Sequence, residues 1–159
     1  MRRKLRIGWF SFTCCEDSTI LFVELLNDKF FEWKDKIDFA YFRTIKRNNE
    51  ISNLDVAFVE GAVSNCEEEK KLKEIRKNAK RLVAIGSCAV LGSPSNQRNF
   101  FDDERLKEIA FIIERFKLKE KVSSVSEVVY VDDTVSGCPM NEETFVTVLE
   151  KYMKEFGVV

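Results

Sequence analysis

Short apolar segments alternate along this chain with longer amphipathic ones. Residues 81–85 are almost continuously apolar, which is typical of a strand that is covered on both faces of a parallel sheet. Strand and helix patterns that alternate in this way favour βαβ units. The pattern therefore predicts an α/β fold in which helices flank a parallel sheet.

The individual elements follow from the same patterns. Strands are predicted at residues 5–10, 37–42, 55–59, 81–85 and 128–131. Helices are predicted at residues 19–31, 67–79, 103–116 and 141–156, with loops at 43–52 and 92–102. We expect Asn141 to begin the last helix, because its side chain can cap free amides and two acidic residues follow it.

The size and charge of the chain exclude several classes of protein. Its 159 residues, 45% of them hydrophobic, predict one domain over residues 1–159 with its own core. Twenty-six basic and 27 acidic residues give a net charge of −1, which argues against a nucleic-acid partner. No apolar run approaches the roughly 20 residues of a membrane-spanning helix, so no membrane span is expected.

The sequence contains no histidine but five cysteines. The lack of histidine excludes Ser-His-Asp and Cys-His catalysis, histidine-ligated zinc or haem, and Rieske centres. An odd number of cysteines without an export signal argues against a disulfide framework. The cysteines are therefore candidates either for metal binding or for simple packing in the core.

Every cysteine follows a predicted strand, outside the predicted helices and strands. Cys14 and Cys15 follow the first strand, and Cys66 follows the third. Cys88 follows the fourth strand and Cys138 follows the last. Because the carboxyl ends of parallel strands share one edge of an open sheet, where ligands bind, we expect these thiols to meet there.

Four convergent thiolates suit either a tetrahedral zinc ion or an iron–sulfur cluster. Zinc sites usually contain two close cysteine pairs, whereas here one pair is adjacent and the other cysteines are far apart. The adjacent Cys14 and Cys15 fit two irons of a larger cube better than two corners around one ion, which favours a 4Fe–4S cluster. A structural zinc site and incidental cysteines are the alternatives. Cys66 is the weakest candidate, because three glutamates follow it at a helix start.

Four short motifs carry a family resemblance. They are Phe12-Thr13-Cys14-Cys15-Glu16, Val59-Glu60-Gly61, Gly86-Ser87-Cys88-Ala89 and Gly137-Cys138-Pro139. In this order and spacing, over residues 5–156, the chain resembles the small subunits of nickel–iron hydrogenases and the homologous cluster subunit of respiratory complex I. The resemblance implies a flavodoxin-like α/β domain with one proximal 4Fe–4S cluster at the C-terminal ends of the strands.

The resemblance also implies the cluster ligands. Cys88 and Cys138 match the family's Gly-x-Cys-Ala and Gly-Cys-Pro turns. Cys14 and Cys15 are assigned as the other ligands, adjacent as in the complex I subunit, whereas small subunits of hydrogenases usually contain Cys-x-x-Cys. Cys66 is a possible substitute for one of this pair, or a nearby thiol.

Two acidic residues belong to the same motifs. Glu16 and Glu60 match carboxylates that lie near the partner interface in the family, where some are proposed in proton transfer. The alternative for both is a carboxylate that caps a helix or accepts hydrogen bonds from loop amides.

The implied function is electron relay in a soluble, cytoplasmic nickel–iron hydrogenase. The chain would pass electrons between one cluster and a nickel–iron large subunit, with no catalytic centre of its own, and further subunits would carry iron–sulfur clusters or flavin. The alternatives are a complex I-like cluster subunit of a quinone- or ferredoxin-linked module, and a cluster-free flavodoxin-like interaction protein. The sequence lacks a Gly-x-Gly-x-x-Gly or P-loop pattern, so no nucleotide or flavin site of its own is expected.

Overall fold

A parallel five-stranded sheet forms the centre of the computed structural model, which describes residues 3–159. Its strand order is β2-β1-β3-β5-β7. These strands are Leu5–Ser11 (β1), Ile37–Phe42 (β2), Leu54–Glu60 (β3), Ala79–Ile85 (β5) and Asp133–Val135 (β7). Val63–Asn65 (β4) and Leu118–Ser123 (β6) pair as a separate antiparallel ribbon. The order is that of flavodoxin-like sheets, which confirms the predicted fold class.

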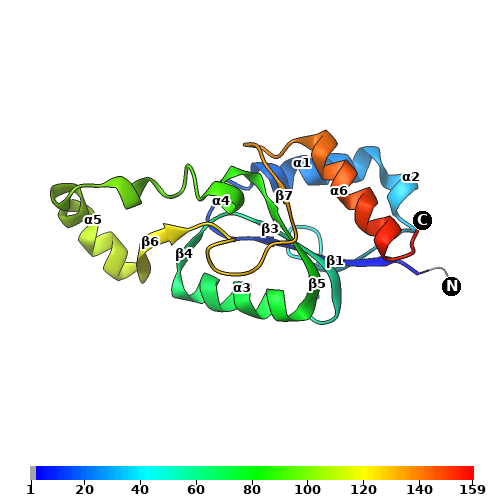
Figure 1. Cartoon of the computed structure of the whole chain (residues 1–159), viewed down its shortest axis with the longest axis horizontal. Coiled ribbons are helices and arrows are strands. Elements are labelled where there is room, and N and C mark those ends of the chain that lie inside the picture. The colour runs from blue at the N-terminus through cyan, green and yellow to red at the C-terminus, as the bar shows by residue number, and fades with distance from the viewer. Residues whose placement is uncertain (1–2) are drawn as a thin grey trace.

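Helices cover both faces of this sheet (Figure 1). One face carries Asp17–Asp28 (α1), Phe30–Trp33 (α2) and Glu142–Glu155 (α6). The other face carries Cys66–Asn78 (α3). Beyond the end of the sheet toward which β1 runs lie Gly86–Leu91 (α4), the 3-10 helix Gln97–Phe100 (η1) and Asp103–Arg115 (α5).

The sheet separates two hydrophobic cores, because successive strand residues point to opposite faces. Phe58 of β3 packs with α1 and α6, whereas the next residue, Val59, packs on the side of α3. Trp9 stacks on Phe22 of α1 with 4.4 Å between the ring centroids. All of β3 is buried, as expected for the central strand of a sheet that is covered on both faces.

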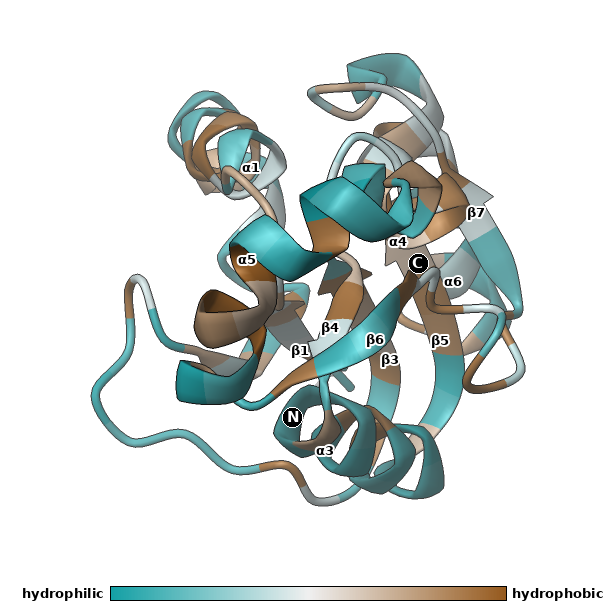
Figure 2. Cartoon of the chain, turned by 90° about the vertical axis from the view of Figure 1, so that its left-hand side faces the viewer, coloured by the Kyte–Doolittle hydropathy of each residue, from teal (hydrophilic) through white to brown (hydrophobic). Residues whose placement is uncertain are grey.

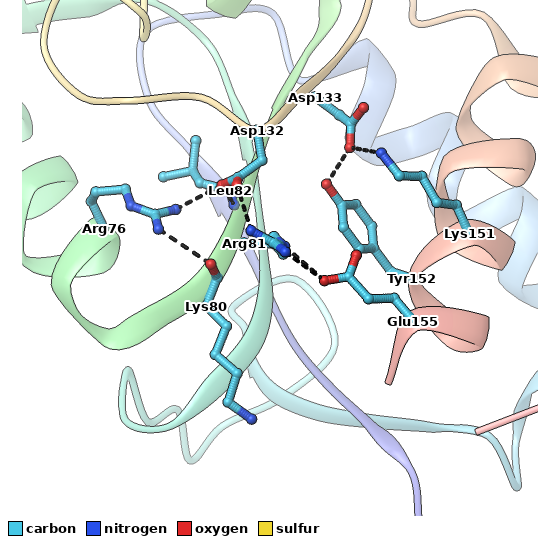
Figure 3. Close-up of polar contacts among 9 residues, drawn as sticks. All are labelled: Arg76, Lys80, Arg81, Leu82, Asp132, Asp133, Lys151, Tyr152 and Glu155. Atoms are coloured by element: carbon cyan, nitrogen blue, oxygen red, sulfur yellow. Dashed lines mark hydrogen bonds and ion pairs between the residues drawn. The ribbon is translucent and has the colours of Figure 1, made fainter. Parts of the chain in front are cut away.

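The strand predicted at residues 128–131 is wrong, because this segment is irregular and the fifth strand is β7. Asp132 provides the physical reason (Figure 3). Its carboxylate accepts a hydrogen bond from the Leu82 amide (2.9 Å) and pairs with Arg76 (3.0 Å) and Arg81 (3.1 Å). The valines of the segment pack against the core on the α3 side. The apolar run therefore covers one face of the sheet and does not extend it.

Several short elements escape the sequence patterns. Helix α4 begins where β5 ends and contains Cys88, while Cys66 is the first residue of α3. The expectation that all five cysteines lie outside helices and strands is therefore wrong for these two. A helix of six residues is too short to show a helical apolar period. The helix predicted at residues 19–31 divides into α1 and α2 at Lys29.

Helix α5 has apolar residues at helical spacing but packs beside β6 and not on the main sheet. Every residue of α5 is exposed or only half-buried. Figure 2 shows hydrophobic stretches of this helix on the side of the molecule where the main strands end. Within residues 3–159, no helix combines the length and the apolar character needed to cross a membrane.

Candidate metal centre

Four of the five cysteines line one cavity at the carboxyl end of the sheet. Its thiols are those of Cys14, Cys15, Cys88 and Cys138. These residues come from the loop after β1, from α4 after β5, and from the turn after β7. The topology thus brings together positions that lie far apart in the sequence.

Cys66 is not among the residues that line this cavity. It is exposed at the first position of α3. Strand β4, which lies between β3 and α3, belongs to the separate two-stranded ribbon. The chain therefore leaves the main sheet before it reaches Cys66.

Hydrogen bonds between loops connect the cysteine-bearing segments. The Ser87 amide donates to the Gly137 carbonyl (2.7 Å), which joins the start of α4 to the turn after β7. The Ser95 hydroxyl donates to the Thr13 carbonyl (3.2 Å), which joins the segment after α4 to the loop after β1. The same hydroxyl oxygen lies 3.2 Å from the Cys88 sulfur.

The turn before Cys138 requires glycine. Gly137 has a φ of +121°, and a Cβ atom there would lie 2.4 Å from the carbonyl oxygen of Pro139. Glycine adopts such a conformation without the steric cost that a side chain would add. Gly137 therefore lets the chain turn sharply at the cavity wall.

Glu60 caps α1 from the end of β3. Its buried carboxylate accepts hydrogen bonds from the amides of Ser18 (3.0 Å) and Thr19 (3.1 Å), and from the Thr19 hydroxyl (2.6 Å). Helix N-termini of this kind often bind phosphate groups, and here a carboxylate of the chain takes that place. Burial raises the pKa of Glu60, although the hydrogen bonds from Thr19 and Ser18 oppose the shift. Glu60 also lines the cysteine cavity.

Glu16 lies on a different cavity from the one that the cysteines share. It immediately precedes α1 and has a φ of 65°. With Arg43 and Lys71 it lines another cavity, of about 170 Å³. The capping interpretation thus describes the observed contacts of Glu60, and proton transfer remains a prediction for both acids.

The four thiols differ in exposure and in electrostatic surroundings. Cys88 is 8% exposed and Cys14 is half-buried, whereas Cys15 and Cys138 are exposed. Burial and the nearby carboxylate of Glu60 raise the pKa of the Cys14 thiol to about 12. The cavity is therefore enclosed by protein near Cys88 and reaches solvent near Cys15 and Cys138.

The cysteine thiols line a shared cavity but do not form a site for a single metal ion. Across residues 3–159, no three Cys, Asp or Glu side chains are grouped closely enough to hold a single metal ion. The four thiols nevertheless line one cavity. The thiols are therefore gathered at one place without forming a site for one ion.

Two serines of this region could not be identified from the sequence. Ser95 contacts Cys88, and the hydroxyl of Ser18 accepts a hydrogen bond from the Met140 amide (3.1 Å). Ser95 lies in a segment whose composition indicates only a loop, and Ser18 lies at a helix start, where serine is common. Their partners are distant in sequence, so only the folded chain reveals these contacts.

Comparison with known proteins gives one family and several relatives. A family model described as "NADH ubiquinone oxidoreductase, 20 Kd subunit" matches residues 14–152. The chain is 26% identical to a subunit of the F420-non-reducing hydrogenase of Methanothermobacter marburgensis, over 97% of this chain and 55% of that protein. It is 25% identical to NAD-reducing hydrogenase HoxS subunit delta of Cupriavidus necator, over 92% of this chain and 78% of that protein. The chain spans about half the length of the F420-non-reducing hydrogenase subunits that it matches.

Solved structures show the same fold. One chain of the crystal structure of an NAD+-reducing [NiFe]-hydrogenase in the H2-reduced state superposes with a TM-score of 0.83 and 28% identity. That match covers 96% of this chain and 93% of the other. A Ni-Fe-Se hydrogenase from Desulfomicrobium baculatum gives a TM-score of 0.68 at 14% identity, which supports the fold alone.

Proposed function

The chain belongs to the family of the 20 kDa subunit of NADH ubiquinone oxidoreductase, and on that premise we propose that it is the electron-transfer small subunit of a nickel–iron hydrogenase. Cys14, Cys15, Cys88 and Cys138 hold one 4Fe–4S cluster in this proposal. The observation that carries it is the single cavity that these four thiols line, although they come from three separate segments. We propose a hydrogenase and not another complex because similar proteins are hydrogenase subunits.

The donor set fits this cofactor. Soft thiolate ligands suit iron–sulfur clusters, and four cysteines are the usual complement of a 4Fe–4S cluster. A structural zinc ion needs its ligands at about 2.3 Å around one point. In the part of the chain that the structure describes, no such grouping of Cys, Asp or Glu exists. The adjacent Cys14 and Cys15 fit two irons of a cube better than two corners around one ion, which favours the cluster over zinc.

In this proposal, the burial of Cys88 and the hydrogen bonds of Glu60 both support electron relay. When bound, a cluster supplies one-electron redox chemistry. Burial of Cys88 excludes water from one side of the cavity. Glu60 holds the start of α1, which the Cys14–Cys15 loop enters directly, and so fixes where that loop lies. Its negative charge at the cavity wall favours the oxidised form of a neighbouring redox group.

We place the large-subunit interface on the face where Cys15 and Cys138 are exposed. Two large apolar side chains are also exposed on the elements that carry the site, Ile20 on α1 (57%) and Leu91 at the end of α4 (66%). In this proposal, a partner on this face covers the open side of the cavity, and these exposed side chains are candidates for contacts with it. Further electron carriers, iron–sulfur clusters or flavin, lie elsewhere in this proposed cytoplasmic complex.

Anaerobic purification of the full chain tests the proposal. We expect a brown protein with about four irons and four acid-labile sulfides per chain. Its electron paramagnetic resonance (EPR) spectrum after reduction should show one cluster. A colourless protein would contradict the cluster and support a cluster-free interaction protein. One zinc per chain would support a structural zinc site instead.

A complex I-like cluster subunit is the second candidate, because Cys14 and Cys15 are adjacent and the matching family model is that of the 20 kDa subunit. The complex isolated from its native cells distinguishes the two. Hydrogen-dependent reduction of a viologen dye supports the hydrogenase. A complex that contains the cluster but does not oxidise hydrogen supports the complex I-like module.

A further inference from the structure

We propose that Ser95 is a positioning residue that raises the reduction potential of the cluster through a hydrogen bond to the sulfur of Cys88. The inference rests on the proposed function, because it requires the cluster to be present. Ser95 lies between α4 and η1, outside the four motifs that suggest the site. Its role is therefore separate from the assignment of the ligands.

The geometry places one hydroxyl between two acceptors. The oxygen of Ser95 lies 3.2 Å from the sulfur of Cys88 and 3.2 Å from the carbonyl oxygen of Thr13. Ser95 is half-buried and Cys88 is 8% exposed, so this contact lies largely away from water. Hydrogen bonds are electrostatically stronger in such surroundings.

The protonation state of Cys88 decides which group donates. As a neutral thiol, Cys88 can donate its proton to the oxygen of Ser95, while the Ser95 hydroxyl donates to Thr13. As a metal-bound thiolate, Cys88 has no proton, so the Ser95 hydroxyl is the group that can donate across this contact. A serine hydroxyl carries one proton and must then turn from the carbonyl to the sulfur.

The Thr13 carbonyl tolerates this change. It also accepts a hydrogen bond from the Ala62 amide at 2.9 Å. When the Ser95 hydroxyl turns away, the carbonyl therefore keeps one partner and does not incur the cost of an unsatisfied buried group. The Ser95 hydroxyl can thus donate to the Cys88 sulfur without leaving a carbonyl of the loop after β1 unpaired.

The other cysteine sulfurs of the cavity have no side-chain donor of this kind among residues 3–159. Backbone amides of Glu16 and Asp17 lie beside the sulfurs of Cys14 and Cys15, and a further contact joins Cys14 to the carbonyl oxygen of Phe12 at 3.6 Å. A carbonyl oxygen has no proton to donate to a thiolate. Ser95 is therefore the side-chain donor that a substitution can remove from a ligand sulfur, whereas backbone amides stay in place when a side chain is changed.

The redox consequence follows from charge. Reduction adds one electron, supplied by the large subunit or by dithionite, and Ser95 keeps its proton throughout. A hydrogen bond to a ligand sulfur stabilises the more negative, reduced cluster more than the oxidised one, and this raises the potential. Loss of the Ser95 hydroxyl should therefore make the cluster harder to reduce.

The test is a redox titration of the full chain, purified anaerobically with its cluster and followed by EPR. At the wild-type midpoint potential, Ser95→Ala should raise the ratio of oxidised to reduced cluster about tenfold, a negative shift of about 59 mV for one electron. Ser95→Thr keeps a hydroxyl and should stay near the wild-type potential. Ser93→Ala, an exposed position in the same loop, is the matched control and should cause no shift.

The outcomes separate this inference from the function on which it rests. A Ser95→Ala protein with full iron content and an unchanged midpoint overturns the role of Ser95 but leaves the cluster assignment intact. Wild-type protein without iron overturns the cluster itself. If Ser95→Ala loses iron, Ser95→Thr and Ser95→Val decide, because they have similar shapes and differ in the hydroxyl. A higher potential for the threonine variant supports the inference, and equal potentials refute it.

Discussion

The polar groups at the two ends of the parallel sheet differ in how far they are paired within the chain. At the amino end, the buried Asp55 is fully paired: its carboxylate lies 3.0 Å from Arg3 and 2.7 Å from Lys80, and it accepts a hydrogen bond from the Arg6 amide. At the carboxyl end, four thiols line a cavity in which two of them face solvent. The amino end is complete as the chain folds, whereas the carboxyl end is where we propose that a group from outside the chain binds.

The largest expected effect concerns the carboxyl end. Cys138→Ser should remove most of the iron from anaerobically purified protein, because a serine hydroxyl is a poor substitute for a soft thiolate ligand. Cys66→Ser makes the same change at an exposed cysteine outside the cavity and should leave the iron content unchanged. Iron and sulfide analysis of both variants checks this. A comparable loss in both would place Cys66 in the ligand set and break the contrast between the two ends.

The second prediction tests Glu60, the one carboxylate in the cavity wall that is fully hydrogen-bonded. Glu60→Ala leaves the buried amides of Ser18 and Thr19 without their acceptor. The free energy of unfolding, measured with urea, should fall by about 2 kcal/mol, because an unsatisfied buried donor costs about 1–3 kcal/mol. Glu16→Ala is the control and should change stability by less than about 0.5 kcal/mol, as is usual for an exposed residue. Equal effects would mean that Glu60 does not support α1.

The third prediction concerns the paired charge at the amino end. Asp55→Asn keeps the shape of the side chain but removes its charge, and should cost about 1 kcal/mol at pH 7, since both partner cations are partly exposed. Iron content should remain that of the wild type, because Asp55 lies at the opposite end of the sheet. A loss of iron in this variant would show that the two ends are coupled.

The same residue gives a pH dependence with a definite sign. Burial by itself would raise the pKa of Asp55, but hydrogen bonds from Lys80 and the Arg6 amide, with the charges of Lys80 and Arg3, hold it below its usual value. A carboxyl whose pKa is lowered by folding stabilises the protein above its unfolded pKa of about 3.9 and loses that contribution as pH falls through the folded pKa. The stability difference between wild type and Asp55→Asn should therefore be constant near neutral pH and shrink below about pH 4. Urea unfolding at several pH values measures it, and a difference that grows on acidification would contradict this sign.

The sequence predicts the centre of the fold better than its margin. Strands β3 and β5 are long and apolar, and their predicted positions differ from the observed ones by at most two residues. Strand β7 has three residues, of which only Val135 is buried, so it leaves no apolar pattern. The apolar segment at 128–131 is a stronger strand signal but is held outside the sheet by Asp132. A single side chain that bonds a distant backbone amide is not visible in local periodicity.

At the site too, the sequence predicts some features and not others. The rule that parallel strands end at one edge predicts that Cys14, Cys88 and Cys138 meet, because it depends only on the order of the elements. The contacts of Ser95 and Glu60 depend on side chains that reach segments 82 and 42 residues away. Such contacts are decided by the packing of the folded chain, for which a single sequence carries no local signal.

The smallest expected effect comes from Asn141, which lies close in sequence to Cys138. Its substitution should change stability without changing the cysteine site. Asn141 caps α6: its side-chain oxygen accepts hydrogen bonds from the amide (2.8 Å) and the hydroxyl (2.7 Å) of Thr144, as the sequence predicts for this position. Asn141→Ala should lower the free energy of unfolding by about 1 kcal/mol, the usual cost of a lost N-cap, and Asn141→Ser should restore most of it. Because the cap satisfies amides of α6 and touches none of the thiols, iron content and EPR spectrum should not change, although Cys138 is only three residues away. A shifted EPR spectrum in Asn141→Ala would mean that the turn carrying Cys138 depends on the start of α6. The capped helix would then help to fix the geometry of the cysteine site.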